Sequence, residues 1–349
     1  MDFTVSDMKN LVAYTPGEQP RDMDYIKLNT NELPYPPSPD VIKALSDFNP
    51  RLYPDPASGK LKAAIAEYYN LRKENIFVSA GSDEALSFAF RAFIAGEKVF
   101  FADITYDFYR VFSAYYNAAA TMIPLSENFR INVSDYHIAG DNSTIIIANP
   151  NAPTGLYLSN NEIEELLLQN PRRLVIIDEA YIDFGGNSAL GLTNKYNNLL
   201  IMRTFSKSRG LAGLRLGFAA GASPLIEALE KVKYSCNPYN VNMAAQLAGT
   251  AAICDDLYFQ KTVKAVTNTR EKLKENLIAM GAKVTDSMAN FVFASFPGIN
   301  GGEIYSKLKK RGVLVRYFDK PRIREYVRIT IGTEAEIDSL VEICANEFF

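Results

Sequence analysis

Short apolar runs alternate with helix-type segments along the first two thirds of the chain, and this alternation is the feature that most limits its possible folds. Runs of strand type occupy residues 76–79, 98–102, 121–123, 144–148, 174–177 and 199–202. Strands that are apolar throughout and connected by helices indicate a mostly parallel sheet buried on both faces. The sequence therefore predicts an α/β fold built around such a sheet.

The length of 349 residues allows two domains, and the pattern changes near residues 236–238, which read Cys-Asn-Pro. We expect three parts, namely a proline-rich N-terminal arm at residues 1–40, a large domain at 41–240 and a small C-terminal α/β domain at 241–349. One long helical stretch over residues 242–280 is expected to lead into the small domain. A strand is expected at residues 313–317.

Composition and charge exclude several classes of function. The net charge is −3 with no basic block, so nothing favours nucleic-acid binding. The N-terminus lacks a signal-peptide pattern and no apolar run has membrane-spanning length, so we expect a cytoplasmic protein with no membrane partner. The three cysteines have no metal-type spacing, and the only histidine, His137, lies in a polar segment. We therefore expect no metal site and no serine-histidine triad.

The candidate reactive residue is Lys207. The apolar run 199–202 leads into a polar loop that carries Ser206 and Lys207 and is followed by three glycines. Arg215 lies eight residues after Lys207, and a nearby cation favours the uncharged amine, which can act as a nucleophile and form a Schiff base. A solvated lysine in a basic turn is the alternative interpretation.

Polar residues follow the other strands at the edge where a parallel sheet binds ligands. Ser82 and Asp83 start a helix after a glycine turn, and the free amides of a helix start suit a phosphate, although an ordinary capped helix has the same pattern. Tyr106 follows the next strand and could stack on a flat ring or simply pack. Asn151 lies in a proline-rich turn that would direct its amide into the same crevice.

Asp178 comes directly after a wholly apolar strand. A buried carboxylate needs a cationic partner or a metal, and no His or Cys cluster supports a metal. A protonated pyridine nitrogen would satisfy Asp178, and Tyr181 could reach the phenolic oxygen of the same ring. Together with the lysine, the helix start and the arginine, these residues indicate pyridoxal phosphate.

Over nearly its whole length the chain resembles the fold-type I aminotransferases. The motifs that carry the resemblance are YPDP (53–56), AGSDE (80–84), NPNAPTG (149–155), IDEAY (177–181), TFSKSRGLAGLRLG (204–217) and VRITIGT (327–333). The resemblance implies a pyridoxal-phosphate enzyme whose large domain has a mostly parallel central sheet flanked by helices, followed by a smaller C-terminal α/β domain. It also implies a homodimer with shared active sites.

The same resemblance assigns roles around the cofactor. Lys207 would be the Schiff-base lysine and Asp178 the partner of the pyridinium nitrogen. The side chains implied at the cofactor ring are Tyr106 on its face and Asn151 and Tyr181 at its ring oxygen. Those implied at the phosphate are Ser82, Asp83, Ser206, Arg215 and, from the opposite subunit, Tyr53.

Substrate contacts follow from the resemblance as well. Arg328 would bind the α-carboxylate of the amino-acid partner, and Arg316 would bind a substrate phosphate. Tyr14 and Asn31 in the arm would face the substrate. The arm departs from the family at NTNELPYPPSP, where Leu33 and Pro37 replace residues that the family commonly has.

The implied reaction moves an amino group between L-histidinol phosphate and 2-oxoglutarate, as a step of histidine biosynthesis. A threonine-phosphate decarboxylase, which differs only in the bond that is broken, is the first alternative. An aromatic amino-acid aminotransferase, which would leave Arg316 without a phosphate, is the second. A ligand-sensing regulator would carry a DNA-binding domain ahead of the fold, whereas the cofactor-binding motifs here begin within the first few dozen residues.

Overall fold

The apolar runs form a seven-stranded sheet in the computed structural model, which describes residues 3–4, 8, 11–46, 48–137 and 143–348. The strand order is β2 (Ile76–Ser79), β8 (Gly217–Gly221), β7 (Leu199–Thr204), β6 (Leu174–Asp178), β5 (Ser143–Ala148), β3 (Lys98–Ala102) and β4 (Ala119–Ile123). All neighbouring pairs are parallel except the two that β8 makes with β2 and β7. The prediction of a mostly parallel sheet is confirmed.

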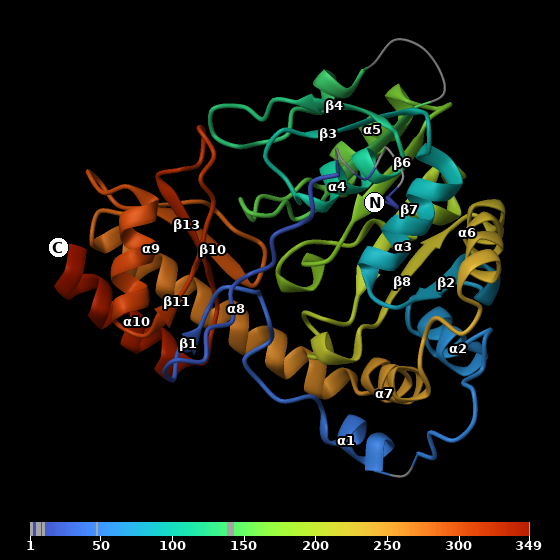
Figure 1. Ribbon diagram of the computed structural model, residues 1–349, viewed down its shortest axis with the longest axis horizontal. Helices are drawn as coiled ribbons and strands as arrows, with labels where there is room; N and C mark the ends of the chain where they lie inside the picture. The colour runs from blue at the N-terminus through green and yellow to red at the C-terminus, as the bar shows by residue number, and fades with distance from the viewer. Residues whose placement is uncertain (1–2, 5–7, 9–10, 47, 138–142, 349) are drawn as a thin grey trace.

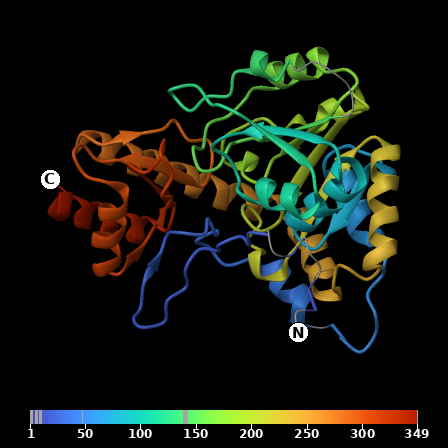
Figure 2. The same cartoon turned by 45° about the horizontal axis from the view of Figure 1, so that its top comes forward.

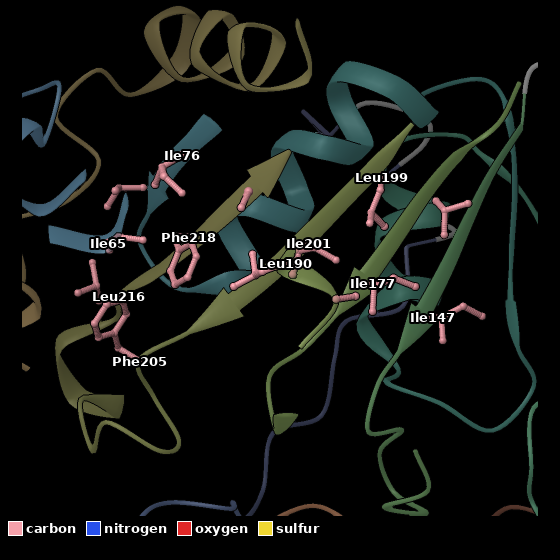
Figure 3. Packing of buried hydrophobic residues seen from close by; sticks show 14 of the residues in the cluster. Ile65, Ile76, Ile147, Ile177, Leu190, Leu199, Ile201, Phe205, Leu216 and Phe218 are labelled. Atoms are coloured by element: carbon pink, nitrogen blue, oxygen red, sulfur yellow. The ribbon is translucent and has the colours of Figure 1, made fainter. Parts of the chain in front are cut away.

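Helices cover both faces of this sheet, which explains why its strands are apolar throughout. One face packs against α2 (Gly59–Tyr68), α5 (Asn160–Gln169) and α7 (Met243–Cys254), and the other against α3 (Ser82–Ala89), α4 (Phe108–Tyr115) and α6 (Ser223–Cys236). Successive residues of β6 alternate between the faces: Val175 and Ile177 belong to one buried cluster and Ile176 to the other. In Figure 3 Ile147, Ile177 and Ile201 come from neighbouring strands and belong to the first cluster.

The small domain is a second α/β unit with its own core. Its four-stranded antiparallel sheet has the order β12 (Arg316–Tyr317), β13 (Tyr326–Thr330), β10 (Phe291–Ser295) and β9 (Lys283–Val284). The helices α8 (Asp256–Ala279), α9 (Gly301–Lys310) and α10 (Glu334–Phe348) pack on it. Figure 1 shows α8 running from α7, beside the large sheet, to the strands of the small domain.

The arm is joined to the small domain by a strand that the sequence pattern did not predict. β1 (Ile26–Lys27) pairs in parallel with β11 (Val313–Leu314), and Leu28 is buried in the core of the small domain. The N–H of Thr330 donates to the carbonyl oxygen of Leu28 at 2.9 Å. The arm, blue in Figure 2, lies along the orange and red domain before it continues to α1 (Pro39–Ser46).

Two expected elements are wrong in detail. The single helix over residues 242–280 is two helices, because Asp255 leaves helical geometry (φ −87°, ψ 73°) and its side chain caps α8 by accepting from the N–H of Tyr258 at 3.2 Å. The strand expected at residues 313–317 is divided: β11 pairs with the arm and β12 with β13. α7 lies after the expected domain boundary near residue 240 but packs on the large sheet, and α8 leads away from that sheet. The boundary near residue 240 stays a prediction.

Neither a membrane span nor a metal-type cluster is found in the described part of the chain. Its helices are not long and apolar enough to cross a membrane. No group of three or more His, Cys, Asp and Glu side chains lies together among the described residues in a way that could hold a metal ion. His137 is exposed at the end of a short 3-10 helix.

Candidate active site

A pocket lies at the carboxyl ends of the parallel strands, between the two domains and under the arm. The residues of the sequence analysis that line it are Tyr14, Ser82, Asp83, Tyr106, Asp178, Tyr181, Ser206, Lys207, Arg215, Arg316 and Arg328. Asn31, Tyr53 and Asn151 do not line it. Residues that are up to about 300 positions apart in the chain therefore meet in one place, as expected for the ligand-binding edge of an open sheet.

The antiparallel strand β8 brings two distant loops together at one end of the pocket. Ser79, at the end of β2, is paired with Gly217, at the start of β8. The turn after β2 therefore meets the loop before β8, which carries Arg215. A Cβ on Gly217 would lie only 2.6 Å from the backbone nitrogen of Ser82, so a residue with a side chain would push the two segments apart.

This meeting point has the features of a phosphate-binding cradle. Gly81 has φ +84°, and a Cβ there would lie 2.8 Å from Nη2 of Arg215, so the guanidinium passes directly over the glycine. The helix α3 begins at Ser82 without a side-chain cap, which leaves its first amides and the positive end of its dipole toward the pocket. Ser206 adds a hydroxyl that accepts from Nη1 of Arg215 at 3.3 Å. These donors fit the phosphate of the predicted cofactor.

Unlike the other side chains of this cradle, that of Asp83 carries a negative charge and does not suit a phosphate. Its carboxylate lies 3.4 Å from Nη2 of Arg215 and accepts from the hydroxyl of Tyr106 at 2.9 Å. A carboxylate repels a phosphate, so the side chain of Asp83 orients Arg215 and Tyr106 while only its backbone N–H suits the anion. Burial raises the pKa of Tyr106 well above its ordinary value, and the neighbouring Asp83 adds to this effect.

Asp178 ends β6 and is 5% exposed. Burial raises its pKa to about 6, although hydrogen bonds from the hydroxyl of Tyr109 (2.8 Å) and the N–H of Ala180 (3.2 Å) oppose this rise. The sequence analysis missed Tyr109. Its position three residues after Tyr106, with the two rings 5.7 Å apart, is the pattern that could have revealed it. A buried carboxylate that forms no ion pair with any residue in the described part of the chain is suited to a protonated ring nitrogen.

Lys207 projects from the loop after β7 toward the arm. Its Nζ donates to the carbonyl oxygen of Thr30 at 3.0 Å and lies 5.6 Å from the ring centroid of Tyr181. The hydroxyl of Tyr181 accepts from Nδ2 of Asn31 at 3.0 Å, and Oδ1 of Asn31 accepts from the hydroxyl of Thr330 at 2.8 Å. Asn31 thus contacts Tyr181 beneath the pocket wall, and its role toward a substrate stays a prediction.

Two arginines face the pocket from the small domain. Nη2 of Arg328 donates to the carbonyl oxygen of Asn29 at 3.1 Å, and its buried Nε has no hydrogen-bond partner within the described part of the chain. Burial lowers the pKa of Arg328, and neither it nor Arg316 forms an ion pair with any described residue. Both guanidiniums lie over the ring of Phe318, at 5.4 and 5.6 Å. This end of the pocket therefore carries two positive charges that an anionic ligand would balance.

The arm covers the arginine end of the pocket. Arg316 donates to the carbonyl oxygens of Thr15 (2.9 Å) and Pro16 (3.2 Å), which fixes the segment that carries Tyr14. The Tyr14 ring lies 4.5 Å from the ring of Phe108. Burial raises the pKa of Tyr14, while the charges of Arg316 and Arg328 oppose the rise. The hydroxyl of Tyr14 is thus held near both arginines.

Asn151 and Tyr53 lie outside the pocket of a single chain. Nδ2 of Asn151 donates to the carbonyl oxygen of Ile104 (2.9 Å) and to Oγ1 of Thr154 (3.1 Å), so the amide stabilises its own turn while Ala152 lines the pocket. Tyr53 is 79% exposed and stacks on Tyr239 at 4.6 Å. The cofactor roles expected for both residues stay predictions.

The sequence matches a protein family and has close relatives among known proteins. The family described as "Aminotransferase class I and II" matches residues 23–343. A protein of Brachyspira hyodysenteriae named histidinol-phosphate aminotransferase is 51% identical over 345 residues, which cover 97% of both chains. The family match therefore begins within the arm, extends over both domains and includes the pocket residues from Asn29 to Arg328.

Solved structures share the fold at lower identity. Histidinol-phosphate aminotransferase from Sinorhizobium meliloti in complex with pyridoxal-5'-phosphate superposes with a TM-score of 0.85 at 23% identity, covering 93% of this chain and 92% of that one. L-threonine-O-3-phosphate decarboxylase from Porphyromonas gingivalis has a TM-score of 0.79 at 22% identity, with 92% and 98% coverage. Aminotransferases and a lyase thus have the same architecture, and the arrangement of elements alone does not distinguish between their reactions.

Proposed function

This chain belongs to the aminotransferase class I and II family, and on that premise we propose that it moves an amino group between L-histidinol phosphate and 2-oxoglutarate, with pyridoxal 5'-phosphate as cofactor, in histidine biosynthesis. The observation that carries the proposal is that Lys207, Asp178 and the phosphate cradle share one pocket with two arginines that form no ion pair with any described residue. The first three suit the cofactor, and the arginines suit an anionic amine or oxo acid. Histidinol phosphate is the substrate in the name of the relative that is 51% identical over nearly the full length, and 2-oxoglutarate is the partner that the family resemblance implies.

The residues of the pocket fit the cofactor group by group. The amides at the start of α3, the hydroxyl of Ser206 and Arg215 would hold the phosphate. Asp178 would contact the ring nitrogen, since a cation there removes the cost of burying its charge. Lys207 would hold the aldehyde, and Tyr106 would lie against the ring face.

When bound, pyridoxal phosphate supplies an aldehyde that condenses with amines and a ring that withdraws electrons from the neighbouring carbon. With the cofactor bound, Lys207 would take the proton from the Cα of the substrate and return it one carbon away, as a general base and acid. Asp178 would keep the proton on the ring nitrogen. Tyr181, whose hydroxyl accepts from Asn31, would contact the ring oxygen.

A half-reaction tests the proposal. The chain is loaded with pyridoxal phosphate and mixed with L-histidinol phosphate without any oxo acid, while threonine phosphate is added to a parallel sample. We expect the absorbance of the aldehyde form to disappear as pyridoxamine phosphate accumulates, with no carbon dioxide from threonine phosphate. Carbon dioxide release without pyridoxamine phosphate would identify a lyase instead and would overturn the proposal.

Arg328→Gln should weaken substrate binding far more than folding. The substitution removes the cation at the buried end of the pocket, so we expect KM for both substrates to rise on the order of 100-fold. The melting temperature of the cofactor-free chain should stay level or rise, because a buried charge with no ion partner among the described residues is removed. Arg324→Gln, which alters a half-exposed arginine of the same domain, is the control and should leave KM unchanged.

We further propose that two copies form a cytoplasmic homodimer in which Tyr53 of each copy reaches the cofactor phosphate of the other. A hollow at residues 48–54 and 242–244 lies beside the exposed rings of Tyr53 and Tyr239. Leu52 is 59% and Tyr53 79% exposed, a concentration of apolar surface that a second copy would cover.

Complementation checks the shared site. Tyr53→Ala and Lys207→Ala chains, each with impaired activity alone, are unfolded together and refolded as a 1:1 mixture. If Tyr53 acts in the opposite subunit, hybrid dimers contain one intact site and about a quarter of the parent activity returns. A mixture that stays at the level of the separate variants would show that Tyr53 does not act across the dimer.

A further inference from the structure

A cluster of buried charges lies next to the pocket, and none of the steps above uses it. Arg203 on β7 is 3% exposed, and its guanidinium contacts two carboxylates, Oε2 of Glu179 at 3.0 Å and Oδ1 of Asp183 at 2.5 Å. The hydroxyl of Tyr69 accepts a third hydrogen bond from Nη2 at 3.0 Å. Two separate segments of the large domain, the end of α2 and the segment after β6, thus converge on one side chain.

Each carboxylate of the cluster has a second partner. Oδ2 of Asp183 accepts from the hydroxyl of Ser208 at 2.5 Å. Glu179 accepts from the hydroxyl of Ser188 at 2.5 Å and from the N–H of Ala189 at 2.6 Å. Burial raises the pKa of Glu179, and the charge of Arg203 opposes that rise. With so many partners, the positions of both carboxylates are closely defined.

The cluster adjoins the two residues to which the chemistry is assigned. Glu179 directly follows Asp178, and Ser208 directly follows Lys207. Because successive residues at a strand end point to opposite sides, Asp178 and Thr204 line the pocket, whereas Glu179 and Arg203 do not. The bonds from Arg203 therefore connect the segment after β6 with the loop after β7 from behind the pocket wall.

Stability alone is a weak reason for such an arrangement. The desolvation of buried charges offsets most of their attraction, and a well-packed apolar set of similar volume is often as stable. What the charges add is directional: a planar guanidinium fixes two carboxylates at set angles, and a proton transfer by a lysine depends on placement within fractions of an ångström.

We propose that Arg203 is a positioning residue for the proposed transamination, which sets Lys207 relative to Asp178 through two connections. One runs through Glu179 to the backbone of Asp178. The other runs through Asp183 and the hydroxyl of Ser208 to the loop that carries Lys207. Arg203 touches neither cofactor nor substrate and acts only through these neighbours.

The test compares Arg203→Lys with Arg173→Lys, another buried arginine of the same sheet. Arg173 precedes β6 at the opposite end of the strands and donates to Ser143 at 2.9 Å and Asn170 at 2.8 Å. Both substitutions keep the charge and remove a planar guanidinium. Ser208→Ala is the second variant and interrupts only the connection to the Lys207 loop, in case Arg203→Lys does not fold.

The readouts are the visible circular dichroism of the bound cofactor, kcat and KM for the holoenzyme, and the melting temperature. In Arg203→Lys we expect kcat to fall on the order of 10- to 100-fold with KM changed less than about threefold, and the circular dichroism band to weaken. Ser208→Ala should show the same pattern to a smaller extent. Arg173→Lys should lower the melting temperature alone.

Two results would overturn the proposal, and both differ from a failure of the proposed function, on which the inference rests. The first is that Arg203→Lys has the circular dichroism band and the kcat of the parent although its melting temperature is lower. The second matters if Arg203→Lys does not fold: Ser208→Ala would then have the circular dichroism band and the kcat of the parent. A parent chain that binds the cofactor but ignores L-histidinol phosphate would refute the function, while the circular dichroism comparison would still test the positioning role.

Discussion

Lys207→Ala is expected to lose steady-state turnover while the chain keeps its fold. The only hydrogen bond of the lysine side chain in the described structure goes to the carbonyl oxygen of Thr30 at 3.0 Å, so its removal should cost about 1 kcal/mol of unfolding free energy. The proton transfer, by contrast, has no substitute base at that position. We expect kcat to fall on the order of 10⁴-fold, while the melting temperature changes by a few degrees at most.

Lys98→Ala is the matched control, because Lys98 begins β3 in the same sheet and is exposed. It should retain parent activity and stability. If Lys207→Ala kept more than about 1% of the parent kcat, the assignment of this lysine as the proton-transfer group would be wrong.

Asp178→Asn is expected to harm activity and to stabilise the cofactor-free chain. An asparagine does not keep a proton on the ring nitrogen, so kcat should fall by at least about 100-fold. The stability effect follows from the pKa of Asp178, which burial raises from 3.8 to about 6. Below pH 4 the carboxyl group is protonated in both the folded and the unfolded chain, so the parent incurs no penalty there.

Between pH 4 and 6 only the unfolded chain releases this proton, so the stability of the parent falls as the pH rises through this window. Above pH 6 the penalty is constant at about 3 kcal/mol, and Asp178→Asn does not have it. Denaturant unfolding of both cofactor-free chains at pH 4, 5, 6 and 8 should show a stability difference that grows up to pH 6 and then levels off. The raised pKa of Asp178 would be contradicted if the stability difference between the parent and Asp178→Asn did not depend on pH. It would also be contradicted if the exposed control Asp135→Asn showed the same pH-dependent difference.

The strand ends of the large sheet were predictable from sequence because both faces of the sheet are covered. That burial makes the central strands β5, β6 and β7 largely apolar, so the polar residues at or just after their ends, such as Asp178 and Ser206, mark the pocket without any structural information. The glycine turn before Ser82 marked one side of the cradle, whereas the close approach of Gly217 to the backbone of Ser82 is known only from the structure.

Long-range contacts explain what sequence analysis missed. β1 has two residues and forms only because it pairs with β11, so it has no local pattern, whereas β11 falls within the strand expected at residues 313–317. The burial of Arg203 was not predicted, because its charge is balanced by Glu179 and Asp183, which lie in the segment after the neighbouring strand β6. Asn151 was predicted from its motif alone, whereas its hydrogen bonds depend on Ile104, which is 47 residues away.

The pairing of β1 with β11 has a consequence for how the protein is made. Residues 26–27 leave the ribosome early, but their partner, residues 313–314, is among the last parts of the described chain to be synthesised. The phosphate cradle can assemble once residue 217 has emerged, whereas the arm has no strand to join until almost the whole chain is available. The loops of the cradle are thus synthesised well before the strand partner of the arm, so the cover over the arginine end of the pocket is the last part of the site to be put in place.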